Sequence, residues 1–209
     1  MFRFLMQAIS VAALGSLLAA CNSLSEESVA IAYVPSSAPA AVPGAENVSL
    51  SVIAVDKRAQ LRDRIGTKRA VNTARLLAAN DVIDLVRNAV EQDFKAEGFV
   101  IGSGGLTVTI DVQNFYNDFR SEGAFPSALA NVAFTLRVKD GAGTTLYTRF
   151  YEGNGKVENV FNQSADTAKV ALQQALANAV RQVTEDQALQ AVLQSARSKA
   201  AVTAGQRRS

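Results

Sequence analysis

The sequence predicts an α+β fold, a single domain in which helices pack on one face of a mixed, mostly antiparallel sheet. Two observations carry this prediction. Several runs rich in β-branched and aromatic residues alternate apolar with polar positions, and two long segments place apolar residues three and four positions apart. Taken in chain order, the elements read β-α-β-β-β-α-α over residues 48–198.

The first strand and the first helix lie on either side of a basic stretch. Residues 48–55 have apolar side chains on both faces, which predicts a strand inside the sheet rather than at its edge. Asn80 is the expected N-cap of a helix that ends before Gly98. Residues 56–75 show no clean period, so we expect a loop there, or a hairpin too polar to recognise.

Further strands are expected at residues 99–101, 106–113, 132–138 and 144–152. After Val112 the apolar phase slips, because Phe115 lies an odd number of residues away, and this predicts a bulge or a strand end. Residues 121–127 read as a loop. The segment 140–143, Asp-Gly-Ala-Gly, has the composition of a hairpin turn.

Two helices are predicted after the last strand. The first begins at Ser164, has one apolar face, and contains many alanines that would permit a close approach to the sheet. Thr184 followed by Gln187 has the form of a capping box, so we expect a second helix to start there. Residues 199–209 read as a frayed basic tail.

The N-terminus has the form of an export signal. Residues 1–20 combine one positive charge, an apolar run and small residues before Cys21, which is the only cysteine. Leu18-Ala19-Ala20-Cys21 resembles the lipobox of bacterial lipoproteins, which is cut before the cysteine after a lipid is attached to its sulfur. A transmembrane helix is disfavoured because the run is at the short limit for crossing about 30 Å of hydrocarbon. An ordinary signal peptide would leave a lone thiol in an oxidising compartment, which is unusual.

The lipobox resemblance implies a covalent N-terminal lipid, with diacylglyceryl and acyl groups, on Cys21, and therefore a membrane as partner. In the families that this segment resembles, aspartate after the cysteine favours the inner membrane, so Asn22 favours the outer membrane, facing the periplasm. Residues 21–47 are rich in Ala, Ser and Pro. We expect this segment to be a flexible tether of roughly 25–30 Å that holds the domain clear of the bilayer.

Composition excludes several classes of function. The formal charge is only +2, which gives no reason to expect a nucleic acid partner. The chain has no histidine, so it lacks the usual general base and the commonest metal ligand. We therefore expect no metal and no cofactor other than the covalent lipid.

Two groups of residues are candidate contact sites. The cations of the basic stretch could face an anionic partner such as lipid headgroups or peptidoglycan, or they could form a solvated loop that Asp56 and Asp63 partly neutralise. These cations are Lys57, Arg58, Arg62, Arg64, Lys68, Arg69 and Arg75. Four aromatic residues around the phase slip could form a rim for a protein partner or could fill the core. These are Phe115, Tyr116, Phe119 and Phe125.

Catalytic patterns are weak. The glycine-rich segment 102–105 lacks a P-loop lysine and precedes a strand, so we interpret it as a turn. A carboxylate pair for a hydrolase could be drawn from a set that we interpret more simply as solvated side chains. That set is Asp111, Asp118, Glu122 and Glu152.

Beyond the lipobox, most of the mature chain resembles the YajG-type envelope lipoproteins of Gram-negative bacteria. The matching segments, each weak alone, agree in order and spacing. They are Asp56-Lys57-Arg58, residues 97–102, residues 114–118, Tyr151 with Gly153 and Gly155, and Glu185-Asp186. The resemblance implies an outer-membrane lipoprotein without an established activity, and it supplies no catalytic residues.

The functional expectation is a lipid-anchored periplasmic domain that is not an enzyme and serves as a binding or assembly accessory in the envelope. An envelope protein, peptidoglycan and anionic lipid are the possible partners. A cell-wall or lipid hydrolase that uses carboxylates, and an obligate subunit of a larger envelope machine, are the alternatives. The sequence leaves the partner and the oligomeric state open.

Overall fold

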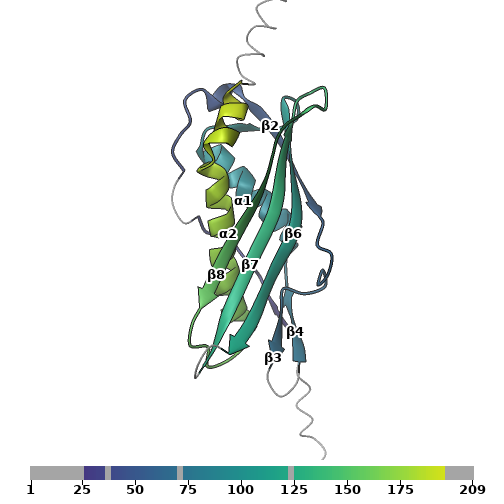
Figure 1. Ribbon diagram of the computed structural model, residues 1–209, viewed down its shortest axis with the longest axis vertical. Helices are drawn as coiled ribbons and strands as arrows, with labels where there is room; N and C mark the ends of the chain where they lie inside the picture. Colours follow the sequence, from purple (N-terminus) through teal and green to yellow (C-terminus); the bar gives the residue numbers. More distant parts are fainter. Residues whose placement is uncertain (1–25, 36–38, 70–72, 122–124, 196–209) are drawn as a thin grey trace, which may run out of the picture.

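The computed structural model describes residues 26–35, 39–69, 73–121 and 125–195 (Figure 1). Cys21, Glu122 and the predicted basic tail lie outside these ranges. The strands are β1 Glu27–Val29, β2 Ser49–Asp56, β3 Gly66–Arg69, β4 Thr73–Ala78, β5 Val100–Ile101, β6 Leu106–Ser121, β7 Pro126–Lys139 and β8 Thr145–Val157. The helices are a 3-10 turn at Ala45–Asn47, α1 Val82–Ala96, α2 Ala165–Thr184 and a final helical run at 187–195.

All the described strands belong to one mixed sheet, which is built around β6. Strands β6, β7 and β8 form a long antiparallel meander. The other edge of β6 is shared, because β2 runs parallel to its first half and β3 pairs in parallel with Asn117 and Asp118 near its end. Strands β4 and β1 continue the sheet beyond β3, and β5 lies beyond β2. The predicted α+β class is confirmed.

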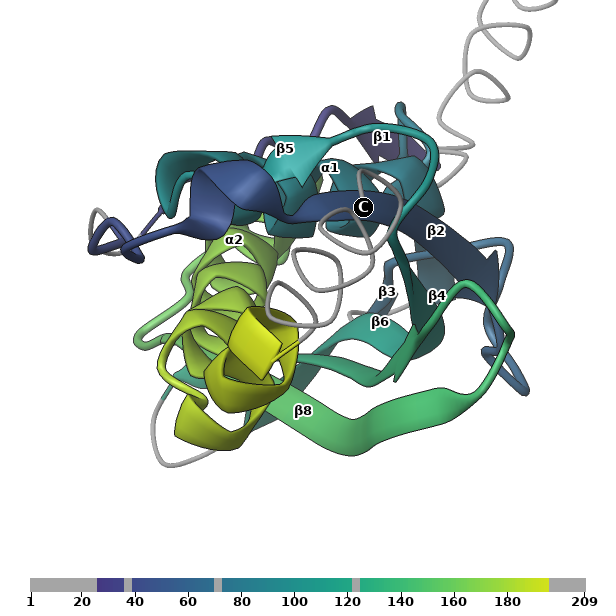
Figure 2. The ribbon, with the colours of Figure 1, turned by 90° about the horizontal axis from the view of Figure 1, so that it is seen from above.

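Helices α1 and α2 pack on the same face of the sheet, and Figure 2 shows the sheet curving around them. Helix α2 lies against β8 and β7, and α1 lies against β2. Gly153 and Gly155 of β8 allow α2 to approach closely, because a Cβ on Gly155 would lie 1.9 Å from the carbonyl oxygen of Ala171. The buried alanines of α2 meet these glycines, as the alanine-rich sequence predicted. None of the helices in the described part of the chain packs on the opposite face of the β6–β7–β8 meander, called the helix-free face below.

The phase slip in β6 is a β-bulge. The pairing register with β7 shifts between Val112 and Asn114, and the strand then continues to Ser121. Because the bulge adds one residue, Phe115 and Phe119 return to the helix-covered side, where both are buried. The strand-end alternative is therefore wrong, and the bulge prediction is confirmed.

The predicted tether is wrong for the described part of residues 21–47. Strand β1 pairs in parallel with β4, and Ile31 is buried in the core. Ala45 is also buried, and the Val42 N–H donates to the carbonyl oxygen of Glu97 at 2.8 Å. The described part of this segment therefore belongs to the folded domain.

Several boundaries also differ from prediction. The basic stretch contains the β3–β4 hairpin, so the hairpin alternative is confirmed there. Asp81, not Asn80, caps α1, because Asn80 instead exchanges two hydrogen bonds with the backbone of Ile31. Asp186 replaces Thr184 as the cap of the last helical run, since its Oδ1 accepts from the Ala188 and Leu189 N–H groups. Residues 126 and 127 belong to β7 rather than to a loop.

Candidate functional site

The loop between β2 and β3 brings three of the predicted cations around one pocket. This pocket has a volume of about 410 Å³ and lies between the loop and the start of α1. Arg58, Arg62 and Arg64 contribute to its wall together with Asp56 and Asp63. The loop runs along the edge of β6 past the bulge, since the Lys57 N–H donates to the carbonyl oxygen of Val112 before the bulge and the Asn117 N–H donates to the carbonyl oxygen of Ile65 beyond it. It therefore fills the gap between the ends of β2 and β3.

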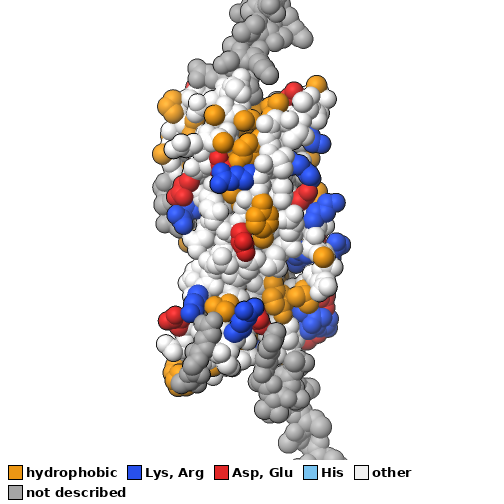
Figure 3. Space-filling view, in the orientation of Figure 1, with side chains coloured by type: hydrophobic (Ala, Val, Ile, Leu, Met, Phe, Trp, Pro, Cys, Tyr) orange, Lys and Arg blue, Asp and Glu red, His pale blue; other side chains and the backbone are white. Residues whose placement is uncertain are grey.

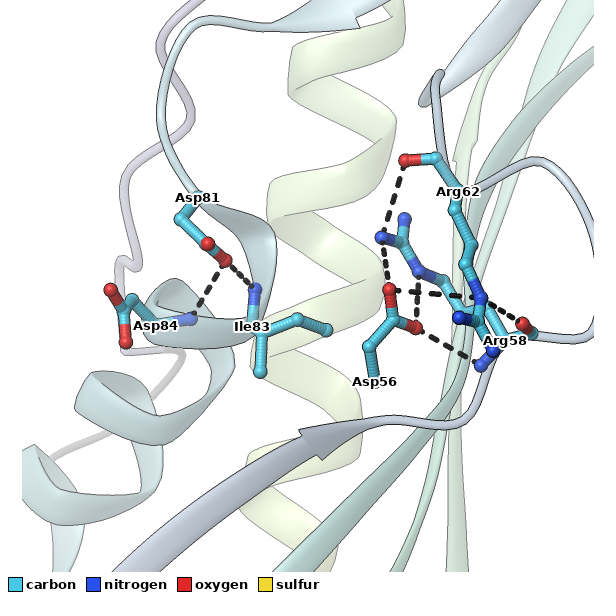
Figure 4. A network of polar contacts seen from close by, with 6 residues as sticks. All are labelled: Asp56, Arg58, Arg62, Asp81, Ile83 and Asp84. Atoms are coloured by element: carbon cyan, nitrogen blue, oxygen red, sulfur yellow. Dashed lines mark hydrogen bonds and ion pairs between the residues drawn. The ribbon is translucent and has the colours of Figure 1, made fainter.

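Arg58 is the centre of this loop and is only 6% exposed. Its Nε and Nη2 donate to the two carboxylate oxygens of Asp56, each at 3.0 Å, as Figure 4 shows. These hydrogen bonds lower the pKa of Asp56. Arg62 adds a second link, because its Nε donates to the carbonyl oxygen of Arg58 at 2.6 Å. The cluster is satisfied internally, so Arg58 is not free to bind an external anion.

The helix end that faces this pocket is also occupied. The Oδ1 of Asp81 accepts from the N–H groups of Ile83 and Asp84 at 2.7 and 3.2 Å (Figure 4). A carboxylate thus stands where the dipole of α1 would attract an anion. The pocket wall carries three arginines against three aspartates, and this balance disfavours an anionic ligand.

Two of the four remaining predicted cations, Lys68 and Arg75, form ion pairs. Lys68 pairs with Glu27, and Arg75 pairs with both Glu26 and Asp63. Hydrogen bonds from Arg64 and Arg75 hold the pKa of Asp63 well below its usual range. Lys57 is exposed, and Arg69 lies in β3, with its side chain outside the description. This stretch is therefore better described as a partly neutralised loop than as an anion-binding surface.

The four aromatic residues that were predicted as contacts differ in how far they are buried. Phe115 and Phe119 fill the core, so the rim interpretation is wrong for them. Tyr116 is partly buried, and its hydroxyl donates to Thr67 at 2.9 Å. Phe125 is exposed and packs against Phe161, with 4.7 Å between ring centroids. Sequence reasoning missed Phe161, which is a single aromatic residue in a polar segment.

A row of amides crosses the helix-free face of the meander. Asn114 donates to Asn131 at 2.6 Å, and Asn131 donates to Glu152 at 2.5 Å and to Asn154 at 3.0 Å. A groove of about 620 Å³ runs beside them and is also lined by Tyr116. Each of the three strands contributes one asparagine to the row. The row can be recognised only when the pairing register of the three strands is known. The lining combines these neutral amides with the charged side chains of Asp118, Arg120 and Lys156, so the groove offers both neutral and charged hydrogen-bonding groups to a ligand.

A pair of buried acids lies where α1 ends. Glu97, only 2% exposed, accepts from Nε2 of Gln190 at 3.0 Å, and Asp93 accepts from the Tyr33 hydroxyl at 2.8 Å. The second carboxylate oxygens of Glu97 and Asp93 have no partner among the described residues. Burial raises the pKa of Glu97 to about 7. Sequence reasoning missed this pair, because a glutamate at the end of a helix is usually a surface residue.

Asp186 joins the sheet to the last helical run. One of its carboxylate oxygens, Oδ2, accepts from Tyr147, Tyr151 and Arg149. Burial opposes ionisation, yet the hydrogen bonds from the two tyrosines lower the pKa of Asp186 to about 2. Every polar atom of this carboxylate is used within the fold, so it is structural.

The carboxylates considered for hydrolysis are engaged wherever they are described. Asp111 pairs with Arg137, Asp118 pairs with Arg120, and Glu152 accepts from Asn131. Across the described ranges, no three or more acidic or cysteine side chains gather in a way that could hold a metal ion. Within the same ranges, no helix is long and apolar enough to cross a membrane.

The family model described as "Uncharacterized lipoprotein" matches residues 35–194. The chain belongs to this family of lipoproteins. A comparison with curated proteins finds no match. Among solved structures, the lipoprotein is similar to an uncharacterized protein with 14% identity and a TM-score of 0.49, over 77% of this chain and 98% of that one.

Two further solved structures are similar to the lipoprotein. One, from Caulobacter crescentus CB15, is provisionally described as a lipoprotein and has 11% identity and a TM-score of 0.46, over 69% of this chain and 90% of that one. The other is a minor lipoprotein from Acinetobacter baumannii, with 11% identity and a TM-score of 0.44, over 67% of this chain and 90% of that one.

The segments that carried the family resemblance have structural roles in this lipoprotein. Gly98 ends α1 with a φ of +102°, which favours glycine. Residues 114–118 follow the bulge of β6, and Gly153 and Gly155 admit α2. Asp186 caps the last helical run. These segments therefore maintain the fold.

Proposed function

We propose that Cys21 carries the lipid and anchors this lipoprotein to the outer membrane, facing the periplasm, where the domain serves as a binding or assembly accessory. The observation that carries the proposal is where the chain enters the fold. Glu27 begins β1, and its Oε2 accepts from the Ala165 N–H at 2.7 Å while its other oxygen pairs with Lys68. Strand β1 therefore starts six residues after Cys21, a distance of at most about 22 Å.

This short connection changes the proposed mechanism. A long tether would let the domain search a deep layer of periplasm, whereas six residues confine it to the membrane surface. Confinement raises the effective concentration of the domain toward a partner in the same layer. The anchor therefore contributes to function by placing the domain as well as by retaining it.

The proposal that the domain is not an enzyme is supported by the way its reactive groups are used. The chain has no histidine, and the described candidate carboxylates make ion pairs or hydrogen bonds within the fold. An acid or base for catalysis needs an accessible group with a pKa matched to its task. Asp186, with its pKa of about 2 and its internal partners, does not meet that need, and Glu97, whose pKa is about 7, is only 2% exposed.

We assign the binding surface to the helix-free face of the β6–β7–β8 meander. The groove beside Asn114, Asn131 and Asn154 supports this assignment, because amides can both donate to and accept from hydroxyl or peptide groups. Peptidoglycan and an extended protein segment both carry hydroxyl or peptide groups of this kind.

Fractionation tests the anchor. The native precursor and Cys21→Ser are expressed in cells, and the membranes are separated on a density gradient. We expect the native protein in the outer-membrane fraction and the variant, uncleaved or soluble, outside it. Mature-size Cys21→Ser protein in the outer membrane would contradict the proposed anchor.

Crosslinking tests the binding face. A photoreactive amino acid replaces Thr135, which lies on the same face as the groove, or, as the control, the exposed Glu185 at the C-terminal end of α2. We expect capture in living cells from Thr135 only, and release of the product by muramidase would identify peptidoglycan. Equal capture from both positions would refute a dedicated binding face.

A further inference from the structure

The end of the molecule that carries Phe125 and Phe161 exposes an aromatic pair. Phe161 is 84% exposed and Phe125 is 43% exposed, and their rings are in contact. The segments that bear them are joined, because the Val160 N–H donates to the carbonyl oxygen of Pro126 at 2.8 Å. A fixed pair of exposed aromatic rings is apolar area that a partner can cover.

The chain enters the fold at the same end. Ala165, whose N–H binds Glu27, is only four residues beyond Phe161. The ends of β3 and β8 and the start of α2 lie together at the lower end of Figure 1, and Figure 3 shows hydrophobic side chains at the lower tip. The described part of the chain thus begins beside the aromatic pair.

We infer that Phe125 and Phe161 insert into the interfacial layer of the phospholipid bilayer that holds the lipid of Cys21, so that the domain stands on this end. The inference rests on the proposed anchoring. Six residues from Cys21 to Glu27 span at most about 22 Å, so an anchored cysteine keeps this end within reach of the bilayer. The long strands then point away from the membrane, and the groove on the helix-free face is displayed above it.

The charges around this end indicate how it binds. Lys68, Arg120 and Lys156 pair with Glu27, Asp118 and Glu158. These cations are neutralised within the fold, so they give little attraction to anionic headgroups. The interaction that we expect at this end is insertion of the two aromatic rings into the bilayer interface. Contact of the tip should therefore change little with salt or with the fraction of anionic lipid.

The absence of tryptophan from the sequence gives a direct test. Phe161→Trp places a single fluorophore at the tip, and Phe150→Trp places a matched one on β8, where Phe150 is 51% exposed. Each mature, lipidated variant is reconstituted into phosphatidylcholine vesicles with or without brominated acyl chains. Cosedimentation with the vesicles is measured in parallel and reports the anchor by itself.

We expect the Trp at 161 to shift to shorter wavelength and to be quenched by brominated lipid roughly twofold more than the Trp at 150. Adding Phe125→Ser should weaken that quenching, and salt should not. If the protein cosediments but the Trp at 161 stays unquenched, the docking inference fails while the anchor stands. Equal quenching at both positions would mean that the domain lies on its side, which also overturns the inference. Failure to cosediment overturns both proposals.

Discussion

Gly153 of β8 lies directly beneath the backbone of α2, so that a Cβ at this position would be 2.0 Å from the carbonyl oxygen of Ala175. No rotamer change relieves this overlap, because the obstacle is helix backbone. The spacing between α2 and the sheet therefore depends on a hydrogen atom in place of a side chain. Helix α2 supplies much of the core, so this contact sets the stability of the domain.

Gly153→Ala should lower the free energy of unfolding by about 3 kcal/mol, because α2 must move away from β8. Gly141→Ala is the matched control, since a Cβ there meets nothing within 4 Å. Urea denaturation followed by circular dichroism measures both variants. Equal stability of the two would show that α2 does not approach β8 this closely.

Glu97 should make the protein less stable as pH rises. Its pKa is raised from 4.5 to about 7 by burial, so the folded state binds a proton more tightly than the unfolded state. The free energy of unfolding should therefore fall between about pH 4.5 and pH 7, by up to about 3 kcal/mol. Glu97→Gln should remove this slope and be the more stable form at pH 8. Glu185→Gln, on an exposed side chain, is the control and should keep the slope.

Asp186 should make the protein more stable as pH rises from about 2 to 4. Its pKa of about 2 lies below the usual 3.8, so its contribution is fully present above about pH 4 and is lost as pH falls toward 2. Asp186→Asn should cost about 2–3 kcal/mol at pH 7, because the tyrosines and Arg149 lose a charged acceptor. Thermal unfolding at pH 7 and pH 2.5 measures this, with exposed Asp166→Asn as the control. A destabilisation of the same size at both pH values would contradict the assignment.

Arg58 should be structural although it belongs to a basic stretch. Arg58→Ala leaves Asp56 without its two-point partner and should destabilise the domain by about 2 kcal/mol. Lys57→Ala, on the exposed neighbour, should change stability by less than about 0.5 kcal/mol. Denaturant midpoints compare the two variants. If only Lys57→Ala destabilised the domain, the role given to Arg58 would be wrong.

The sequence predicts the elements that have strong local signals. Strand β2, α1, the β7–β8 hairpin and the start of α2 each carry a periodic apolar pattern or a cap that acts over a few residues. The bulge after Val112 also follows from local phase. By contrast, β1 is three residues long and is ordered by pairing with β4, almost fifty residues away. No local sequence pattern encodes such a pairing, so the sequence alone suggests a tether for this segment.

The candidate sites depend even more on long-range contacts. Phe161 becomes notable only because the fold places it against Phe125, and the amide row depends on the register of three strands. For the basic stretch, the sequence suggested more exposed positive charge than the structure has. Two of the carboxylates that neutralise it, Glu26 and Glu27, lie in the segment expected to be a tether. Charge counted along the sequence therefore overstated the charge on the surface.

We propose that Cys21 carries the lipid that confines this domain to the membrane surface. Mass spectrometry of the N-terminal tryptic peptide of protein purified from cell membranes tests it most directly. We expect a peptide that begins at Cys21 and carries diacylglyceryl and acyl groups. A peptide that begins elsewhere, or that contains Cys21 as an unmodified thiol, would contradict it.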